Sequence, residues 1–284
     1  MKKAFLLLLL FLVFVLGLGG CSVIRDSFTE EYSLKEASKL KISSKNGSVS
    51  VTGWQEDYLR LRAVLTVNTD HEDLEYRNFV EIVPEWHGEV FELTVLYPPR
   101  PPHVHSVSAT IELEVPQDKI EQVEVETNNG SLGFFNLRSA LAGTSTNGRI
   151  TVEDCEGEID LKTTNGQVVL KHLRFRGEKG SVVTTNGRIE ADVMFPRTGY
   201  FLLRTTNGPI DLKLPSWTEG IIRMKTSTGS ISVDQMPGAL LLRSDKNLLE
   251  IQMHGDGIYL EVETSNGNIN LGESDFIFSS AVVI

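Results

Sequence analysis

Cysteine is scarce in this sequence, because only Cys21 and Cys155 occur among its 284 residues. A disulfide framework and a zinc site built from thiolates both need more cysteines than this, so both are excluded. An intramolecular disulfide would have to join Cys21 to Cys155. Serine-hydrolase elbows, phosphate-binding loops and His-Glu zinc motifs are also missing. We therefore expect no cofactor and no metal.

Positive charge is in short supply as well. The chain has 27 Lys and Arg against 38 Asp and Glu. Removing Lys2 and Lys3 with the N-terminal segment leaves 27 − 2 = 25 cationic residues, so the net charge of the remaining chain is 25 − 38 = −13. A surface this acidic repels phosphate backbones, and we predict that the protein does not bind nucleic acid.

Long apolar runs are absent except at the N-terminus. Residues 1–20, MKKAFLLLLLFLVFVLGLGG, join two lysines to an apolar stretch that ends in small residues, which is typical of an export signal. The segment Leu18-Gly19-Gly20-Cys21 resembles the lipobox of bacterial lipoproteins and implies an acylated Cys21; an ordinary cleavable signal is the alternative. Several acyl chains suffice for stable membrane anchoring. We predict an extracytoplasmic lipoprotein, periplasmic or on the cell surface, with residues 21–35 as a lipid-anchored polar tether.

One short phrase, built around Asn-Gly, recurs along the chain. With its Gly taken as the anchor, the nine copies are centred on Gly47, Gly130, Gly148, Gly166, Gly187, Gly208, Gly229, Asn247 and Gly267. From Gly130 onward the anchors are 18 to 21 residues apart, and so persistent a period is the signature of a stacked repeat. Asn247 is the non-Gly residue that best tolerates a left-handed backbone, so the anchor is predicted to need a positive φ.

Apolar and polar residues alternate on both sides of the anchor, which predicts two half-buried strands per repeat. The second residue after the anchor is apolar in every copy, from Val49 to Ile269. The third residue before it is always Ser or Thr and has the same inward parity, so we expect an internal hydroxyl ladder near the corner. The Asn before each Gly should form a second ladder, interrupted by Thr228 and Lys246.

Two all-β architectures fit this unit. One is an antiparallel meander of Asn-Gly hairpins, and the other is a β-solenoid in which equivalent strands stack in parallel. Recurrence of one residue type at equivalent positions favours the solenoid, because stacking places each residue on its counterpart. We predict an all-β chain, with a β-solenoid of right-handed β-helix type and a C-terminal cap in residues 123–284, the cap being formed by the tail DFIFSSAVVI. Residues 36–122 should hold the first coil and a β insertion that caps the end or pairs along the side.

The phrases LKISSKNGSVSVTGW and IELEVP, followed by a series of TTNGxI repeats, resemble the exported putative-adhesin domains of unknown function of bacterial envelopes. The resemblance extends from about Leu34 to Leu271, most of the chain. It implies a β-solenoid or β-helix fold and a location outside the cytoplasm. It implies no catalytic or ligand-binding residues.

Outward-facing positions are where ligand chemistry must lie. The most ordered external feature is a row of hydroxyls two residues before successive anchors: Thr146, Thr164, Thr185, Thr206 and Ser227. A flat row of this kind suits a glycan or another regular surface, although hydroxyls are also common on exposed strands. Glu190 and Asp211 should neighbour each other on adjacent coils, which is the one acidic pair that hydrolysis could use. His103 and His105 could supply two ligands to a metal ion, but the sequence offers no identifiable third ligand.

These features favour a non-enzymatic envelope lipoprotein that acts as a structural or interaction module, with adhesion as one version. Its expected partners are the membrane, through the lipid, and an envelope glycan or another envelope protein. Two alternatives stay open: a carbohydrate-active enzyme on a β-helix, and an accessory protein in envelope-stress signalling.

Overall fold

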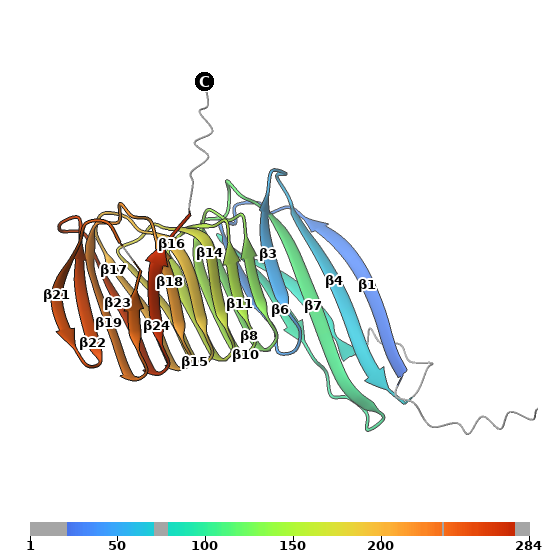
Figure 1. Cartoon of the computed structure of the whole chain (residues 1–284). Coiled ribbons are helices and arrows are strands. Elements are labelled where there is room, and N and C mark those ends of the chain that lie inside the picture. The colour runs from blue at the N-terminus through green and yellow to red at the C-terminus, as the bar shows by residue number, and fades with distance from the viewer. Residues whose placement is uncertain (1–21, 71–78, 235, 276–284) are drawn as a thin grey trace, which may run out of the picture.

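The computed structural model describes residues 22–70, 79–234 and 236–275. Within these ranges the secondary structure consists of β-strands without an α-helix, which confirms the all-β prediction. The strands form two long sheets that lie against each other along one axis (Figure 1). Cys21, with its predicted lipid, lies outside the described residues.

Sheet A begins at the N-terminal end of the solenoid. Its strands, in spatial order, are β1 (Ser22–Tyr32), β4 (Leu59–Thr69), β7 (Val104–Pro116), β3 (Val49–Trp54), β9 (Leu132–Phe135), β11 (Ile150–Glu153), β14 (Val168–Phe175), β16 (Ile189–Met194), β18 (Ile210–Leu214), β24 (Ile269–Glu273) and β20 (Ile231–Val233). The short β12 (Glu156–Gly157) also pairs with β14.

Sheet B runs alongside sheet A. Its strands, from the same end, are β5 (Glu81–His87), β6 (Val90–Leu96), β2 (Lys39–Ser43), β8 (Gln122–Asn129), β10 (Ala140–Asn147), β13 (Ile159–Asn165), β15 (Lys179–Asn186), β17 (Tyr200–Asn207), β23 (Ile258–Asn266), β19 (Gly220–Thr228), β22 (Leu248–Met253) and β21 (Ala239–Asp245). A coil of the solenoid is one strand of sheet B followed by one strand of sheet A, as in β13 and β14.

The core lies between the two sheets and is built from the inward columns that the sequence predicts. Parallel pairing keeps equivalent residues in register, so Ile150, Val168 and Ile189 stack on one another in sheet A, and all three are fully buried. Leu161 and Val182 face them from sheet B with equally little exposure. The prediction of a β-solenoid with two half-buried strands per repeat is therefore confirmed.

Two column positions lack a side chain, and aromatic rings fill the space. A Cβ at Gly180 would lie 2.6 Å from ring atoms of both Phe175 and Phe201. These two rings pack edge to face with centroids 4.8 Å apart, a favourable arrangement for aromatic side chains. The space beside Gly143 is filled in the same way, by the ring of Phe134 and the side chain of Leu161.

The corner glycines are required by close backbone approach. A Cβ at Gly130, Gly148, Gly166, Gly187, Gly208, Gly267 or Gly229 would lie only 1.9–2.1 Å from the carbonyl oxygen of the anchor glycine on the adjacent coil. Of the anchors, Gly47 and Gly229 have a positive φ, and the other glycine anchors lie outside the left-handed region. The predicted general need for a positive φ was therefore wrong, because stacking distance selects glycine here.

Both predicted ladders are present at this corner. Buried hydroxyls of Ser145, Thr163, Thr184, Thr205, Thr264 and Thr226 donate to the anchor-glycine carbonyls of the adjacent coil at 2.9–3.0 Å. Outside them, the amide nitrogens of Asn129, Asn147, Asn165, Asn186, Asn207 and Asn266 donate to the preceding Asn at 2.8–2.9 Å. Together they satisfy polar groups that stacking brings to each corner.

The spatial order of the coils differs from their order in the chain. At the C-terminal end, β23 and β24 insert between the β17–β18 coil and the β19–β20 coil. Asn266 therefore follows Asn207 directly, and Thr228 stands at the end of the amide ladder and does not interrupt it. At the N-terminal end, β6 and β7 stack outside β2 and β3.

The eighth copy of the repeat is a hairpin and does not form a coil, which corrects the sequence interpretation. β21 and β22 pair antiparallel from Asp245 opposite Leu248, and β22 is also antiparallel to β19. Asn247 has no positive φ. The side chain of Asn247 explains why this copy does not form a stacked coil, because a Cβ at a stacked anchor would collide with the neighbouring carbonyl.

The N-terminal insertion caps the end of the solenoid, one of the two expected arrangements. β4 pairs antiparallel with β7 and β5 with β6, so each sheet is extended beyond its last parallel strand. The predicted tether is wrong from Ser22 onward, since residues 22–32 form β1 along the whole of β4. Phe28 and Tyr32 on this strand pack against the core. The sequence did not indicate this strand, because Asp26 and Glu30 interrupt the alternation of apolar and polar residues.

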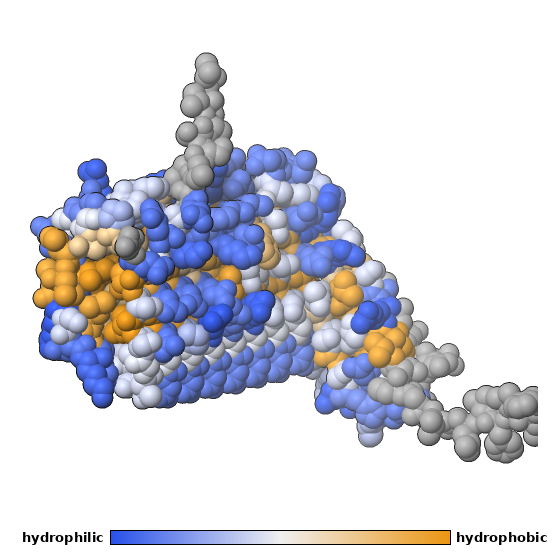
Figure 2. Space-filling model, in the orientation of Figure 1, coloured by the Kyte–Doolittle hydropathy of each residue, from blue (hydrophilic) through white to orange (hydrophobic). Residues whose placement is uncertain are grey.

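The C-terminal end carries an exposed apolar surface. Sheet A ends at β20, whereas sheet B continues beyond β19 by two more strands, β22 and β21. On β21, the side chains Leu240, Leu241 and Leu242 are 63%, 64% and 47% exposed. Figure 2 shows apolar residues gathered at this end of the molecule. The C-terminal cap expected from DFIFSSAVVI lies, apart from its first residue, outside the described residues.

Replacing Gly166 with Ala should destabilise the fold by about 2–3 kcal/mol, because the added methyl meets the Gly148 carbonyl and the stacked backbones must separate. Urea unfolding of the two proteins measures the difference. Gly272→Ala is the matched control: its Cβ meets only the movable Asp234 carboxylate at 3.0 Å, so an equal loss in both variants would contradict the backbone explanation.

Replacing Thr184 with Val should cost about 1–3 kcal/mol, because the change keeps the shape of the side chain but leaves the Gly166 carbonyl without its hydroxyl donor. Thr184→Ser retains the hydroxyl, as Ser145 does naturally on another coil, and should recover most of the loss. The comparison is made by thermal unfolding. Equal stability of the Val and Ser variants would show that the hydrogen bond is dispensable.

Candidate functional site: the outer face of sheet B

The predicted hydroxyl row lies on the outer face of sheet B, one residue before the amide ladder. Thr146, Thr164, Thr185, Thr206 and Ser227 are all exposed, and the parallel register aligns the four threonines on successive strands. Adjacent hydroxyls are therefore about 4.8 Å apart, the spacing of paired strands. The row is flat because every strand that carries it belongs to the same regular ladder.

Sequence reasoning missed one member of this row. Ser265 on β23 lies between Thr206 and Ser227, because β23 separates β17 from β19. The repeat pattern contains Ser265 at the equivalent position, but chain order places it after Ser227. Only the spatial order of the strands shows that it completes the row.

Two rows of hydrogen-bonding groups therefore run side by side along the corner of sheet B. Each hydroxyl can donate and accept, and each ladder Asn keeps one N–H beyond the bond it donates to its neighbour. Side chains held in such a ladder are already ordered, so a ligand loses little side-chain entropy on binding. This surface suits a long ligand that repeats along its length.

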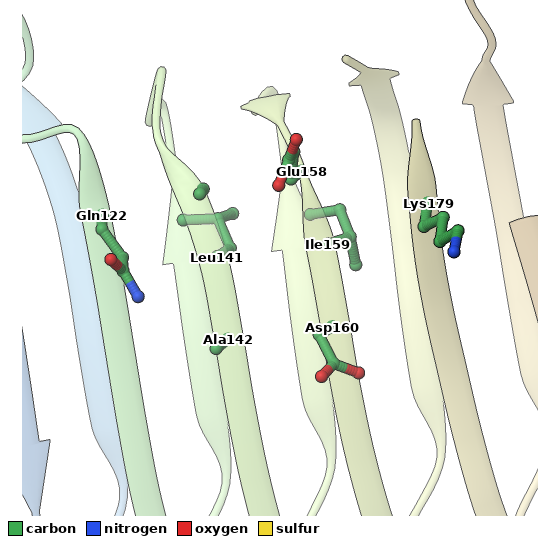
Figure 3. Close-up of a pocket in the computed structure, with 8 residues that line it drawn as sticks. Gln122, Leu141, Ala142, Glu158, Ile159, Asp160 and Lys179 are labelled. Carbon is green, nitrogen blue, oxygen red and sulfur yellow. The ribbon is translucent and has the colours of Figure 1, made fainter. Parts of the chain in front are cut away.

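Shallow depressions lie on the same face, where small residues interrupt longer ones. A depression of about 190 Å³ is centred on Ala142 and Ala140 of β10, with Gln122 on one side and Asp160 and Lys179 on the other (Figure 3). A neighbouring one of about 210 Å³ extends it past Glu124 and Glu126 to Lys162. Both depressions have lining residues on β8, β10 and β13.

A third depression, of about 140 Å³, lies at the C-terminal end of the hydroxyl row. Its lining combines Thr206, Ser265 and Ser227 with Arg204 and Lys225. Glu263, also in the lining, pairs with Arg204 at 2.6 Å. This is the place where the row and cationic side chains meet.

Two tyrosines were not anticipated as features of this face. Tyr200 and Tyr259 stack with their rings nearly parallel and centroids 6.1 Å apart, because β17 and β23 are neighbours in register. Tyr200 donates a hydrogen bond to Glu261 at 2.6 Å, and this bond, assisted by partial burial, raises the pKa of Tyr200 to about 12. The phenol is therefore a fixed donor and not an acid or base at neutral pH.

Glu190 and Asp211 are neighbours, as predicted, but on the outer face of sheet A. Arg188 pairs with both, at 3.1 Å and 3.2 Å, and Asn270 donates to Asp211 at 2.7 Å. Glycoside hydrolysis needs a secluded acid and base on either side of a bound sugar. An exposed cluster centred on an arginine is the ordinary arrangement of surface charges.

The histidine pair does not converge on a metal position. His105 pairs with Asp70 at 2.9 Å, and the His103 carbonyl accepts from the Thr69 hydroxyl. In the described parts of the chain, no group of three or more His, Cys, Asp or Glu side chains is placed to hold a metal. Cys155 is buried, and that burial raises the pKa of its thiol to about 11, so the thiolate is not available near neutral pH.

The described residues contain no helix that is long and apolar enough to cross a membrane. The chain matches no curated protein. Similar solved structures include a putative adhesin from Bacteroides fragilis, 11% identical, with a TM-score of 0.43 over 87% of this chain and 97% of that one. A putative cell adhesion protein from Clostridium sporogenes is 12% identical, with a TM-score of 0.38 over 88% and 100%.

A third similar structure is a putative lipid binding protein from Parabacteroides distasonis, 12% identical, with a TM-score of 0.37 over 88% of this chain and 97% of that one. At this distance none of the three transfers a function. The family comparison matches most of the chain, because the Toastrack model covers residues 37–271, from the strand before the first anchor to the last coil. The resemblance noted in the sequence is thereby confirmed: the chain belongs to the Toastrack family, DUF4097.

Proposed function

We propose that this protein is a non-enzymatic interaction module of the bacterial envelope, with the outer face of sheet B as its binding surface. The observation that carries the proposal is the aligned row from Thr146 to Ser227 beside the amide ladder. Inward positions are selected by stacking, but these hydroxyls point away from the core and are exposed. Their regularity therefore suits recognition of a repeating surface.

The ligand class that this row fits best is an envelope glycan. A sugar chain offers hydroxyls at regular intervals, and a row of Thr, Ser and Asn side chains can donate to and accept from them. The depressions on this face are shallow, so they suit reversible contact along a polymer better than enclosure of a small molecule. Another envelope protein is the second kind of partner.

The location outside the cytoplasm is proposed from the N-terminal sequence. Residues 1–20 have the features of an export signal, and Cys21 stands where the lipobox resemblance implies acylation. Since β1 begins at Ser22, a lipid on Cys21 would hold the N-terminal end of the solenoid directly at the membrane surface.

Replacing Thr164, Thr185 and Thr206 together with Val should abolish most glycan binding. Each lost hydroxyl removes about 1 kcal/mol of hydrogen bonding, so three weaken the affinity roughly 100-fold. Binding of the chain from Ser22 onward to an envelope glycan array measures the effect. Thr52, Thr66 and Thr110 on sheet A provide a matched triple Val control that should bind normally. Hydrolysis of a bound glycan, lost in Glu190→Gln or Asp211→Asn, would instead favour an enzyme.

A Cys21→Ser variant should be exported but released from the membrane, because serine cannot take the acyl chains that anchor the mature protein. Fractionation of cells into membrane and soluble parts, with acyl labelling of the wild type, measures this. A variant that loses its signal segment and still sediments with the membrane would contradict lipid anchoring.

A further inference from the structure

A second outward row runs parallel to the hydroxyl row on sheet B, two residues earlier in each strand. In spatial order it consists of Thr144, Lys162, Val183, Arg204, Glu263 and Lys225. Its three cations occupy every second strand, which sets them about 10 Å apart. The hydroxyl row beside them repeats on every strand.

This spacing exists because of the exchanged coil order. Chain order would place Lys225 on the strand next to Arg204, about 5 Å away. Instead β23 lies between β17 and β19, so Glu263 separates the two cations. The same insertion adds Ser265 to the hydroxyl row, and both rows therefore continue without a break across β23.

The cations differ in how they are held. Arg204 is fixed by Glu263, with Nη2 and Nε at 2.6 Å and 2.8 Å from the same carboxylate oxygen. Lys162 and Lys225 are exposed and form no ion pair with another described residue. Their ammonium groups are therefore not neutralised by a neighbour, and Arg204 between them, with a side chain 49% exposed, still presents N–H groups that Glu263 does not use. Lys225 also lines the depression of about 140 Å³ that contains Thr206, Ser265 and Ser227.

We propose that this double row binds an acidic polysaccharide that carries one anionic group on every second sugar. Successive sugars of an extended chain follow successive strands, so that their hydroxyls meet Thr164, Thr185 and Thr206. The anionic groups then fall on the cation row at every second strand. This inference rests on the proposed function and deepens it, because it names the class of glycan.

The residues between the cations explain why alternate charges fit best. A polymer with an anion on every sugar would place one beside Val183, which cannot pair with it, and another beside Glu263, which repels it. A neutral polymer would meet the hydroxyls but leave Lys162 and Lys225 without partners. The surface therefore discriminates by the period of charge along the ligand.

The test compares three oligosaccharides of equal length by calorimetry at low and at physiological salt. One alternates uronic acid with neutral sugars, one is neutral, and one carries a uronic acid at every position. The protein is the chain from Ser22 onward, which retains every described strand. We expect the alternating ligand to bind most tightly and its affinity to fall with added salt, because exposed ion pairs are screened.

Lys162→Gln combined with Lys225→Gln should weaken binding of the alternating ligand about tenfold and leave the neutral ligand unchanged. Lys213→Gln, on the outer face of sheet A, is the matched control and should alter neither affinity. Equal affinity of the wild type for neutral and alternating ligands overturns this inference but leaves the proposed function intact. Failure of the wild type to bind any glycan or envelope protein overturns the proposed function as well.

Discussion

The whole solenoid depends on one contact between backbones at the corner of each coil. There the anchor glycine approaches the carbonyl of the adjacent anchor so closely that a Cβ would lie about 2 Å from its oxygen. A buried Thr or Ser hydroxyl then donates to that carbonyl, which would otherwise be buried without this partner. Glycine allows the two backbones to approach closely, and the hydroxyl supplies the hydrogen bond that the carbonyl needs there. The two residues must therefore recur together. Every other regular feature, including the amide ladder, follows from this stacking.

The same contact accounts for the unusual order of the coils. Any coil with Thr, Asn and Gly at the corner can stack on any other. Coils that are consecutive in the chain are therefore not favoured over other coils as neighbours in space. β23 and β24 take the position beside β17 and β18, where Asn266 continues the amide ladder. The β19–β20 coil has Thr228 in place of Asn, and it lies at the end of the parallel stack, where no further Asn has to be bonded. Antiparallel strands then close both ends of sheet B, β5 at one and β22 with β21 at the other.

Inside and outside obey different rules in such a fold. Inward positions are constrained by stacking, and aromatic rings even fill the places left by Gly143 and Gly180. Outward positions are free of this constraint, so the order of their side chains is not explained by stacking of the core. On sheet A the outward charges form ordinary clusters such as that around Arg188. On sheet B the hydroxyls stay aligned and the cations alternate, which is why we propose that face as the binding surface.

The sequence by itself determined the repeat, its two strands, the buried columns and both ladders, because these depend on residue types that recur at fixed distances along the chain. It also located four of the hydroxyls in their correct spatial sequence, Thr146 to Thr206. The tertiary structure decided the rest: which coil lies beside which, the hairpin at Asn247, the strand formed by residues 22–32, and the place of Ser265 and Lys225. The physical reason is that equivalent coils present the same corner chemistry. Local patterns therefore cannot rank them as neighbours, and only the packing of the complete chain makes that choice.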